Sequence, residues 1–127
     1  MSLLTKYSPV MELANNFWMK DSSVTEENGV LKVYGVVRTQ YEKNKLWDKI
    51  KEIGGEMPSD IQADIRVENT DYYHIHEVVS GDTLSKIAKH YYGDPMKYPK
   101  IFEANRDQLD NPDLIKVGQK LKIPFVD

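Results

Sequence analysis

The side chains best suited to chemistry in this sequence do not combine into a metal or catalytic site. His74 and His76 lie two residues apart in a segment that reads as a strand, so both fall on one face, a spacing that can bind a metal ion. The chain has no cysteine and no third histidine close by in sequence, and two ligands make a poor site. We therefore interpret both histidines as structural and predict no metal site.

The acidic residues do not indicate catalysis either. A glycosidase needs two carboxyl groups held across a cleft by a rigid frame. Glu26-Glu27 and the acids Asp110 and Asp113 lie in loops, where solvation explains them. The sequence contains no glycine-rich phosphate loop, nucleophile elbow or thiol–base pair. We predict no catalytic residues and expect that the protein is not an enzyme.

Composition narrows the class of protein. The 127 residues allow one ordinary domain or two very small ones, and 40% hydrophobic with 29% charged residues is typical of a soluble globular chain. A net charge of −3 gives no strong basic field to hold nucleic acid. No long apolar run follows a basic segment near the N-terminus, so we expect neither a secretory signal nor a membrane span. The expected location is the cytoplasm, or the cell wall if another route exports the protein.

Residues 1–71 predict an α+β domain with the order helix, strand, strand, helix, strand. Apolar spacing predicts the first helix over Val10–Met19. Asn28-Gly29 predicts a tight hairpin turn between strands Val24–Glu27 and Val30–Val37.

The second helix of this domain lies in the segment TQYEKNKLWDKIKEIGG. Thr39 is expected to be its N-cap with Glu42 as capping-box partner, and Gly54-Gly55 is expected to end it. Alternation of apolar and polar residues then predicts the last strand over Ile61–Val67.

Residues 72–127 predict a second domain with the order strand, helix, helix, strand, in which the two strands pair antiparallel. The first strand is expected in the segment HIHEVV. Asp82 is expected to be the N-cap of a helix that begins at Thr83 and stops at Gly93. A second helix is expected from Pro99 to Asn105.

The second domain resembles a LysM domain. The positions that carry the resemblance span about 50 residues at the family's spacing. They are His76, Val78, Gly81, Asp82, Thr83, Leu84, Ile87, Ala88, Tyr92-Gly93-Asp94, Ile101, Ala104-Asn105, Asp113-Leu114-Ile115, Val117-Gly118, Leu121 and Ile123-Pro124. The family often has Tyr at the first of these positions, where this sequence has His76.

The first domain resembles a BON domain over roughly residues 9–69. The carrying segments are NGVLKVYGVV, EKNKLWDKIKEI and IQADIRV. The resemblances together imply a BON-like αββαβ sandwich followed by a βααβ LysM domain. That order resembles small soluble bacterial proteins, some of which are described as potassium-binding.

The LysM resemblance implies a groove that binds N-acetylglucosamine-containing glycans of the peptidoglycan or chitin type. It places the groove between two loops, whose residues are Gly81, Asp82, Thr83 and Leu84 on one side and Asn111, Pro112, Asp113, Leu114 and Ile115 on the other. Backbone amides can match the donor and acceptor of an N-acetyl group, and we expect Leu84, Leu114 and Ile115 to form a small apolar pocket for its methyl.

Two other functions stay open at this point. One is a cytosolic potassium-binding or stress-response module, for which the sequence names no ligand residues because such sites are built from carbonyl oxygens. The other is a component of a phage tail or baseplate. We expect a monomer without a cofactor, apart from possible potassium.

Overall fold

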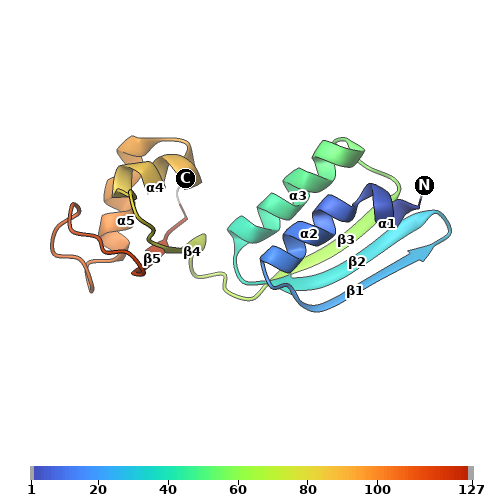
Figure 1. The fold of residues 1–127 in the computed structure, drawn as a ribbon, viewed down its shortest axis with the longest axis horizontal. Coiled ribbons are helices and arrows are strands. Elements are labelled where there is room, and N and C mark those ends of the chain that lie inside the picture. The colour runs from blue at the N-terminus through green and yellow to red at the C-terminus, as the bar shows by residue number, and fades with distance from the viewer. Residues whose placement is uncertain (1, 126–127) are drawn as a thin grey trace. The chain divides into compact units, whose positions relative to one another are not determined.

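The computed structural model describes residues 2–125 of the chain (Figure 1). The chain divides into two compact units, Met1–Thr70 and Asp71–Asp127, each with its own sheet and core. Residue 1 and residues 126–127, at the ends of the two predicted domains, fall outside the described part. Both units combine helices with strands, so the predicted α+β class is confirmed.

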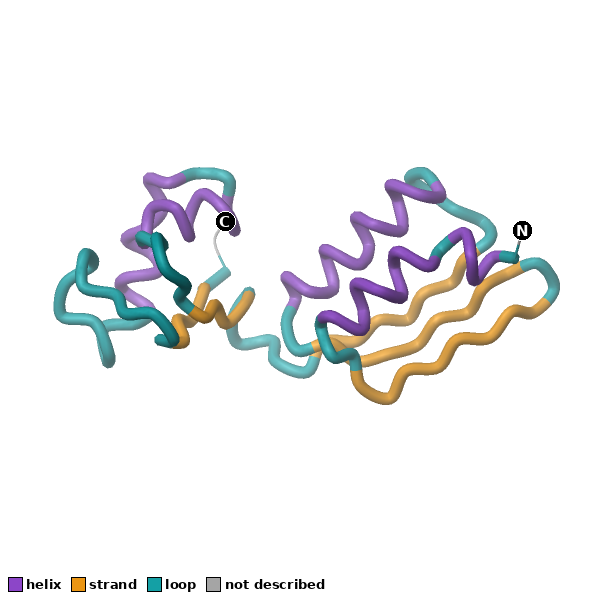
Figure 2. The backbone as a smooth tube through the Cα atoms, viewed as in Figure 1, coloured by secondary structure: helices purple, strands orange, loops and turns teal. Residues whose placement is uncertain are grey.

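The first unit is a three-stranded sheet with its helices on one face (Figures 1 and 2). In chain order its elements are α1 (Leu3–Lys6), α2 (Ser8–Asn16), β1 (Lys20–Glu27), β2 (Val30–Val37), α3 (Gln40–Gly54) and β3 (Ile61–Val67). The predicted order of helix, strand, strand, helix, strand is present. It is preceded by the one-turn helix α1, which the sequence pattern does not indicate.

The central strand of this sheet is β2. It pairs antiparallel with β1 through the predicted turn at Asn28-Gly29, where both residues have positive φ. It pairs in parallel with β3, with Leu31 opposite Ile61 and Val37 opposite Val67, because α3 carries the chain back to the starting edge.

Alternation along β2 decides which face of the sheet is buried. Leu31, Val33 and Val37 are at most 4% exposed and belong to one apolar cluster with the helices. Leu46 and Ile50 of α3 are completely buried in the same cluster. The face of β2 with Leu31, Val33 and Val37 is therefore the core face, and the opposite face carries Lys32 and Tyr34 between Val30 and Val36.

The residue types at its two ends set the bounds of α3, as predicted. The Thr39 hydroxyl accepts a hydrogen bond from the backbone N–H of Glu42 at the N-terminus. Glu42 is itself buried, and its carboxylate accepts a hydrogen bond of 2.9 Å from the backbone N–H of Arg38. At the other end Gly55 takes a φ of +88°, which stops the helix.

The junction between α2 and β1 differs from the prediction. Helix α2 ends at Asn16 rather than Met19, and β1 begins at Lys20, four residues before the expected start. Trp18 and Asp21 both have positive φ, so the backbone turns there and the apolar spacing over Phe17-Trp18 does not continue as helix. The added part of β1 is polar and exposed throughout, and therefore lacks the alternation that marks a strand.

The second unit packs helices against a two-stranded sheet (Figure 2). Its elements are β4 (His74–Glu77), α4 (Leu84–Tyr92), the 3₁₀ helix η1 (Pro95–Lys97), α5 (Tyr98–Ala104) and β5 (Lys120–Ile123). The strands pair antiparallel with His74 opposite Ile123, as predicted. Strand β4 is two residues shorter than expected, because the chain leaves the sheet after Glu77.

A buried asparagine connects α5 to β5. Asn105 is fully buried, and its side-chain amide donates hydrogen bonds to the carbonyl oxygens of Ile101 at 2.7 Å and Lys122 at 2.9 Å. Its side-chain oxygen accepts one from the backbone N–H of Lys122, also at 2.9 Å. The side chain thereby satisfies backbone groups of both elements around the core residues Ile101 and Leu121.

Candidate functional site

The corner between β4 and α4 is a tight turn. The backbone N–H of Asp82 donates to the carbonyl oxygen of Val79 at 3.1 Å, and Gly81 between them has a φ of +89°. A Cβ added at Gly81 would meet nothing within 4 Å. Glycine is therefore required at this position by the backbone conformation and not by lack of space.

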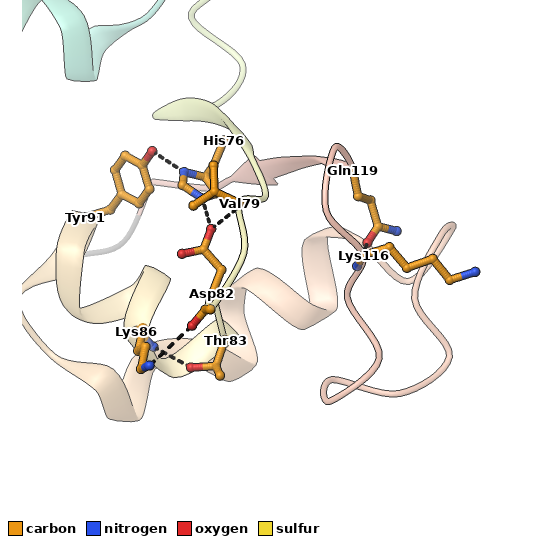
Figure 3. Close-up of polar contacts among 9 residues, drawn as sticks. His76, Val79, Asp82, Thr83, Lys86, Tyr91, Lys116 and Gln119 are labelled. Carbon is orange, nitrogen blue, oxygen red and sulfur yellow. Dashed lines mark hydrogen bonds and ion pairs between the residues drawn. The ribbon is translucent and has the colours of Figure 1, made fainter.

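The predicted cap of α4 is wrong by one residue. Thr83 has extended backbone, and its hydroxyl accepts a hydrogen bond of 3.2 Å from the backbone N–H of Lys86. Thr83 is thus the N-cap, and the helix begins at Leu84 instead of Thr83. Asp82 cannot take this role because its carboxylate points back towards β4 (Figure 3).

Asp82 belongs to a chain of side chains that holds the corner in place. Its Oδ2 accepts a hydrogen bond of 2.9 Å from the Val79 N–H and lies 2.8 Å from His76 Nε2 (Figure 3). His76 Nδ1 lies 2.7 Å from the hydroxyl of Tyr91 on α4. Since the carboxylate only accepts, Nε2 is the donor to Asp82.

These contacts shift the ionisation of Asp82. Burial on its own raises the pKa of this carboxyl. The hydrogen bonds from His76 and from the Val79 N–H outweigh the burial, so the pKa of Asp82 lies below its usual value. Asp82 is therefore charged in the folded protein at neutral pH, and it acts as the anchor of the corner.

The facing loop is stabilised by its own turn chemistry. The Asn111 side-chain oxygen accepts from the Asp113 N–H at 2.8 Å, and the Leu114 N–H donates to the Asn111 carbonyl at 3.1 Å. Further along, the Lys116 N–H donates to the Gln119 side-chain oxygen at 3.1 Å (Figure 3). The Gly118 N–H then reaches the carbonyl of Val78, which ties this loop to the residue after β4.

A hollow of about 280 Å³ lies between the corner and the facing loop. Its lining residues are Thr83, Leu84, Ser85, Tyr98, Pro112 and Asp113. That volume lies just below the range of ligand pockets, which starts at roughly 300 Å³. It has room for a single sugar ring with a small substituent. The walls combine hydroxyls and a carboxylate with the ring of Tyr98 and the pyrrolidine of Pro112, so they can contact both polar and apolar parts of a ligand.

The structure brings together four of the nine residues predicted for the groove. They are Thr83 and Leu84 from the corner and Pro112 and Asp113 from the facing loop. Leu84 is only 3% exposed, so it contributes the floor of the hollow while most of its side chain belongs to the core.

The other five predicted residues do not line this hollow. Gly81 and Asp82 shape the corner behind it, and Asn111 forms the turn of the facing loop. Leu114 is 66% exposed beside the hollow, whereas Ile115 packs on the core of the unit. The apolar pocket expected from Leu84, Leu114 and Ile115 together is therefore not formed by these three side chains.

Two lining residues, Ser85 and Tyr98, are not among the predicted site residues. Of the five tyrosines in this unit, the three on the helices, Tyr91, Tyr92 and Tyr98, are the candidates for sugar stacking. Tyr91 contacts His76, and Tyr92 donates a hydrogen bond of 2.6 Å to the carbonyl oxygen of Pro124, which leaves Tyr98 as the tyrosine in the hollow. The feature that distinguishes Tyr98 is its position as the first residue of α5, directly after η1.

Within residues 2–125, no group of three or more histidine, cysteine or acidic side chains is arranged to hold a metal ion. His74 and His76 both contact the Tyr91 ring, with ring centroids 5.4 Å apart in each case. The same part of the chain includes no helix that is long and apolar enough to span a membrane.

The sequence that forms the corner, the capped helix and the facing loop can be compared with the sequences of known proteins. Residues 76–124 match the LysM domain. The LysM domain thus includes the corner, α4, α5, the facing loop and β5. The hollow lies entirely within it.

Three relatives show how far the similarity extends. The chain is 39% identical over 97 residues to the potassium binding protein Kbp of Escherichia coli O6:H1, covering 76% of this chain and 64% of Kbp. It is 58% identical over 50 residues to a Deinococcus radiodurans protein, covering 39% of this chain and 19% of that protein. It is 43% identical over 49 residues to Esterase Rv1288 of Mycobacterium tuberculosis, covering 39% of this chain and 10% of the esterase. The chain thus spans less than two thirds of each of these relatives.

Proposed function

We propose that this protein is a non-enzymatic binding protein whose LysM domain takes an N-acetylglucosamine unit of a peptidoglycan- or chitin-type glycan. The observation that carries the proposal is the hollow between Thr83-Leu84-Ser85 and Pro112-Asp113, inside the segment that matches the LysM domain. LysM domains bind glycans that contain N-acetylglucosamine. The size and mixed polarity of the hollow support a single sugar ring with its acetamido group.

Each wall of the hollow has a role in this proposal. Tyr98 and Pro112 offer flat apolar surfaces for the ring and the methyl group, and Leu84 closes the floor. The Thr83 and Ser85 hydroxyls, 3.2 Å apart, can donate to and accept from sugar hydroxyls. The acid Asp113 can accept from a sugar hydroxyl or from the acetamido N–H.

The proposed absence of catalysis also rests on the residues around the hollow. Asp113 is the one carboxylate that lines it among the described residues, whereas glycoside hydrolysis needs two across the bond. The match to Esterase Rv1288 covers a tenth of that protein and lies over the length of one LysM domain. It therefore gives no support to esterase activity in this chain.

A titration of isotope-labelled full-length protein with chitotetraose tests the proposal. Backbone amides of residues 83–85, 98 and 113 are expected to shift in a saturable way. Tyr98→Ala is expected to weaken binding about tenfold, as the loss of an aromatic stacking surface does elsewhere. Tyr41→Ala, which removes an aromatic side chain from α3 in the other unit, is the matched control. No shift in these amides at millimolar chitotetraose contradicts the proposal.

A second function is favoured by a different observation. The similarity to the potassium binding protein Kbp covers 76% of this chain and therefore includes residues of both units. We propose potassium binding as the alternative. Replacing sodium chloride with potassium chloride at constant ionic strength is expected to shift a defined set of amides if this alternative is correct. Equal spectra in the two salts exclude it.

The first unit, the location and the assembly state remain proposals as well. The order α2, β1, β2, α3, β3 supports the resemblance of the first unit to a BON domain. We propose a cytoplasmic monomer. Light scattering during gel filtration tests the monomer, and cell fractionation with an antibody tests the location.

A further inference from the structure

The outer face of the three-stranded sheet is a second candidate for a binding site. Helices α2 and α3 cover the other face (Figures 1 and 2). On the outer face Tyr34 lies at the middle of β2, paired with Ser23 of β1 on one side and with Asp64 of β3 on the other. The next row has Lys32 between Thr25 and Gln62. One aromatic ring therefore has short polar side chains of β1 and polar side chains of β3 on its two sides, with Lys32 next to it on β2.

These residues surround a shallow hollow of about 320 Å³. Its lining residues are Ser23, Thr25, Lys32, Val33, Tyr34, Gln62, Ala63 and Asp64. Tyr34 is half-buried, whereas the polar residues on both sides of it are exposed. The ring is thus held in place by its neighbours while part of its surface remains open to a ligand.

The charges on this face are paired with each other. Lys32 Nζ lies 3.3 Å from a carboxylate oxygen of Glu27, and the Arg66 guanidinium lies 3.4 Å from a carboxylate oxygen of Asp64. The Arg66 guanidinium also lies 6.0 Å from the centroid of the Tyr34 ring. Two cations beside two carboxylates leave the face close to neutral. Such a face does not attract the phosphates of a nucleic acid, which need an excess of positive charge.

Several polar groups on this face have no hydrogen-bond partner within residues 2–125. They are the hydroxyls of Ser23, Thr25 and Tyr34 and the amide of Gln62. The large apolar side chains exposed in this unit, such as Trp18 and Met57, do not line the hollow. A protein partner needs buried apolar anchors at the centre of its interface, so the composition of the hollow disfavours one.

We propose that the outer face of the sheet binds a neutral sugar ring, stacked on Tyr34 and hydrogen-bonded by Ser23, Thr25, Gln62 and Asp64. A pyranose has one face rich in C–H groups, which packs on an aromatic ring, and a rim of hydroxyls. Hydroxyl and amide side chains both donate and accept, and the carboxylate accepts, so the set matches a rim of hydroxyls. This site is in the other unit from the LysM hollow and does not depend on the function proposed for that hollow.

Amide shifts of the labelled full-length chain with two neutral probes, chitotetraose and cellotetraose, test this site. Saturable shifts are expected at residues 23–25, 32–34 and 62–64 with at least one of the two probes. Tyr34→Ala is expected to weaken binding at these amides about tenfold, and Tyr34→Phe is expected to stay within about twofold because the ring is kept. Tyr41→Ala serves as the aromatic control on the helical side of the same unit.

Three results overturn the inference. The first is the absence of shifts on the sheet face with both probes, and the second is unchanged binding in Tyr34→Ala. The third is a response of these amides to inorganic phosphate or a thymidine oligonucleotide alone, which would assign the face to anions. The amides of residues 83–85, 98 and 113 report the LysM hollow in the same spectra. Failure at one site is therefore distinguishable from failure at the other.

Discussion

The carboxylate of Asp82 sits at the point where the corner, β4 and α4 meet, through its contacts with the Val79 N–H and His76. Its pKa is lowered in the folded protein, so the stability it contributes is present above the unfolded pKa of about 3.9 and is lost as pH falls through the folded value. We predict that Asp82→Ala lowers the free energy of unfolding by about 1–2 kcal/mol at pH 7. The difference from wild type should shrink below pH 4.

Urea denaturation at pH 7 and at pH 3 measures this effect. Asp82→Asn is the matched control, because it keeps the size of the side chain and removes the charge. It should lose most of the stabilisation that comes from the charged hydrogen bonds. A difference between Asp82→Ala and wild type that is equally large at both pH values shows that the charge of Asp82 does not stabilise the corner.

The cap of α4 gives a second test at the same scale. Thr83→Ala removes the hydroxyl that accepts from the Lys86 N–H, and we predict a loss of about 1 kcal/mol in unfolding free energy. Thr83→Ser keeps a hydroxyl in the same place and should remain within about 0.5 kcal/mol of wild type. Thermal melts of the three proteins provide the measurement. Equal stability of Thr83→Ala and wild type contradicts the assignment of Thr83 as the cap.

At the scale of elements, the buried side chain of Asn105 connects α5 with β5 by hydrogen bonds. Asn105→Ala leaves the carbonyl oxygens of Ile101 and Lys122, and the Lys122 N–H, without their side-chain partner in a buried place. We predict a loss of about 2–3 kcal/mol of unfolding free energy, the cost of unsatisfied buried polar groups. Hydrogen exchange should accelerate for the amides of β5. Arg106→Ala, on the exposed neighbouring residue, is the control.

The elements that the sequence predicts best are those whose signals are local. Helix α3 carries its own cap at Thr39 and its own stop at Gly54-Gly55, and the hairpin turn is specified by Asn28-Gly29. The first half of β1, residues 20–23, is entirely polar, and only pairing with β2 makes it part of a strand, so this half has no signal in the sequence. The end of α2 at Asn16 depends on backbone turns at Trp18 and Asp21 that the apolar spacing conceals.

The residues of the candidate site are likewise predicted well only where their signals are local. Its two loops are located in the sequence by the resemblance to a LysM domain, and Gly81 and Asn111 have the residue types that their turns prefer. The direction in which a single side chain points depends on its contacts with other elements, so the local sequence pattern does not predict it. Asp82 is suited to capping by its residue type, yet it points to His76, a residue six positions earlier on β4. Tyr98 joins the hollow because η1 and α5 place it opposite Pro112, a proximity that spacing along the chain does not record.

At the scale of the whole molecule, the dependence of binding on salt distinguishes the two functions proposed for this chain, glycan binding and potassium binding. The net charge is −3, and the LysM hollow is lined by one acidic residue and no basic residue. A neutral glycan releases no counterions on binding, so we predict that its affinity changes by less than about twofold between 50 and 500 mM sodium chloride. Calorimetry with chitotetraose at both salt concentrations measures it.

The same titration in potassium chloride tests whether the ion and the glycan act on one another. If glycan binding is the function of the LysM hollow and potassium has no role, the affinities in sodium and potassium chloride should agree at equal ionic strength. If potassium binds and alters the hollow, linkage requires that the glycan affinity change in potassium alone, by the same factor by which the glycan changes the affinity for potassium. A glycan affinity that falls steeply and equally with both salts contradicts both expectations, because it requires a charged contact that a neutral ligand does not make.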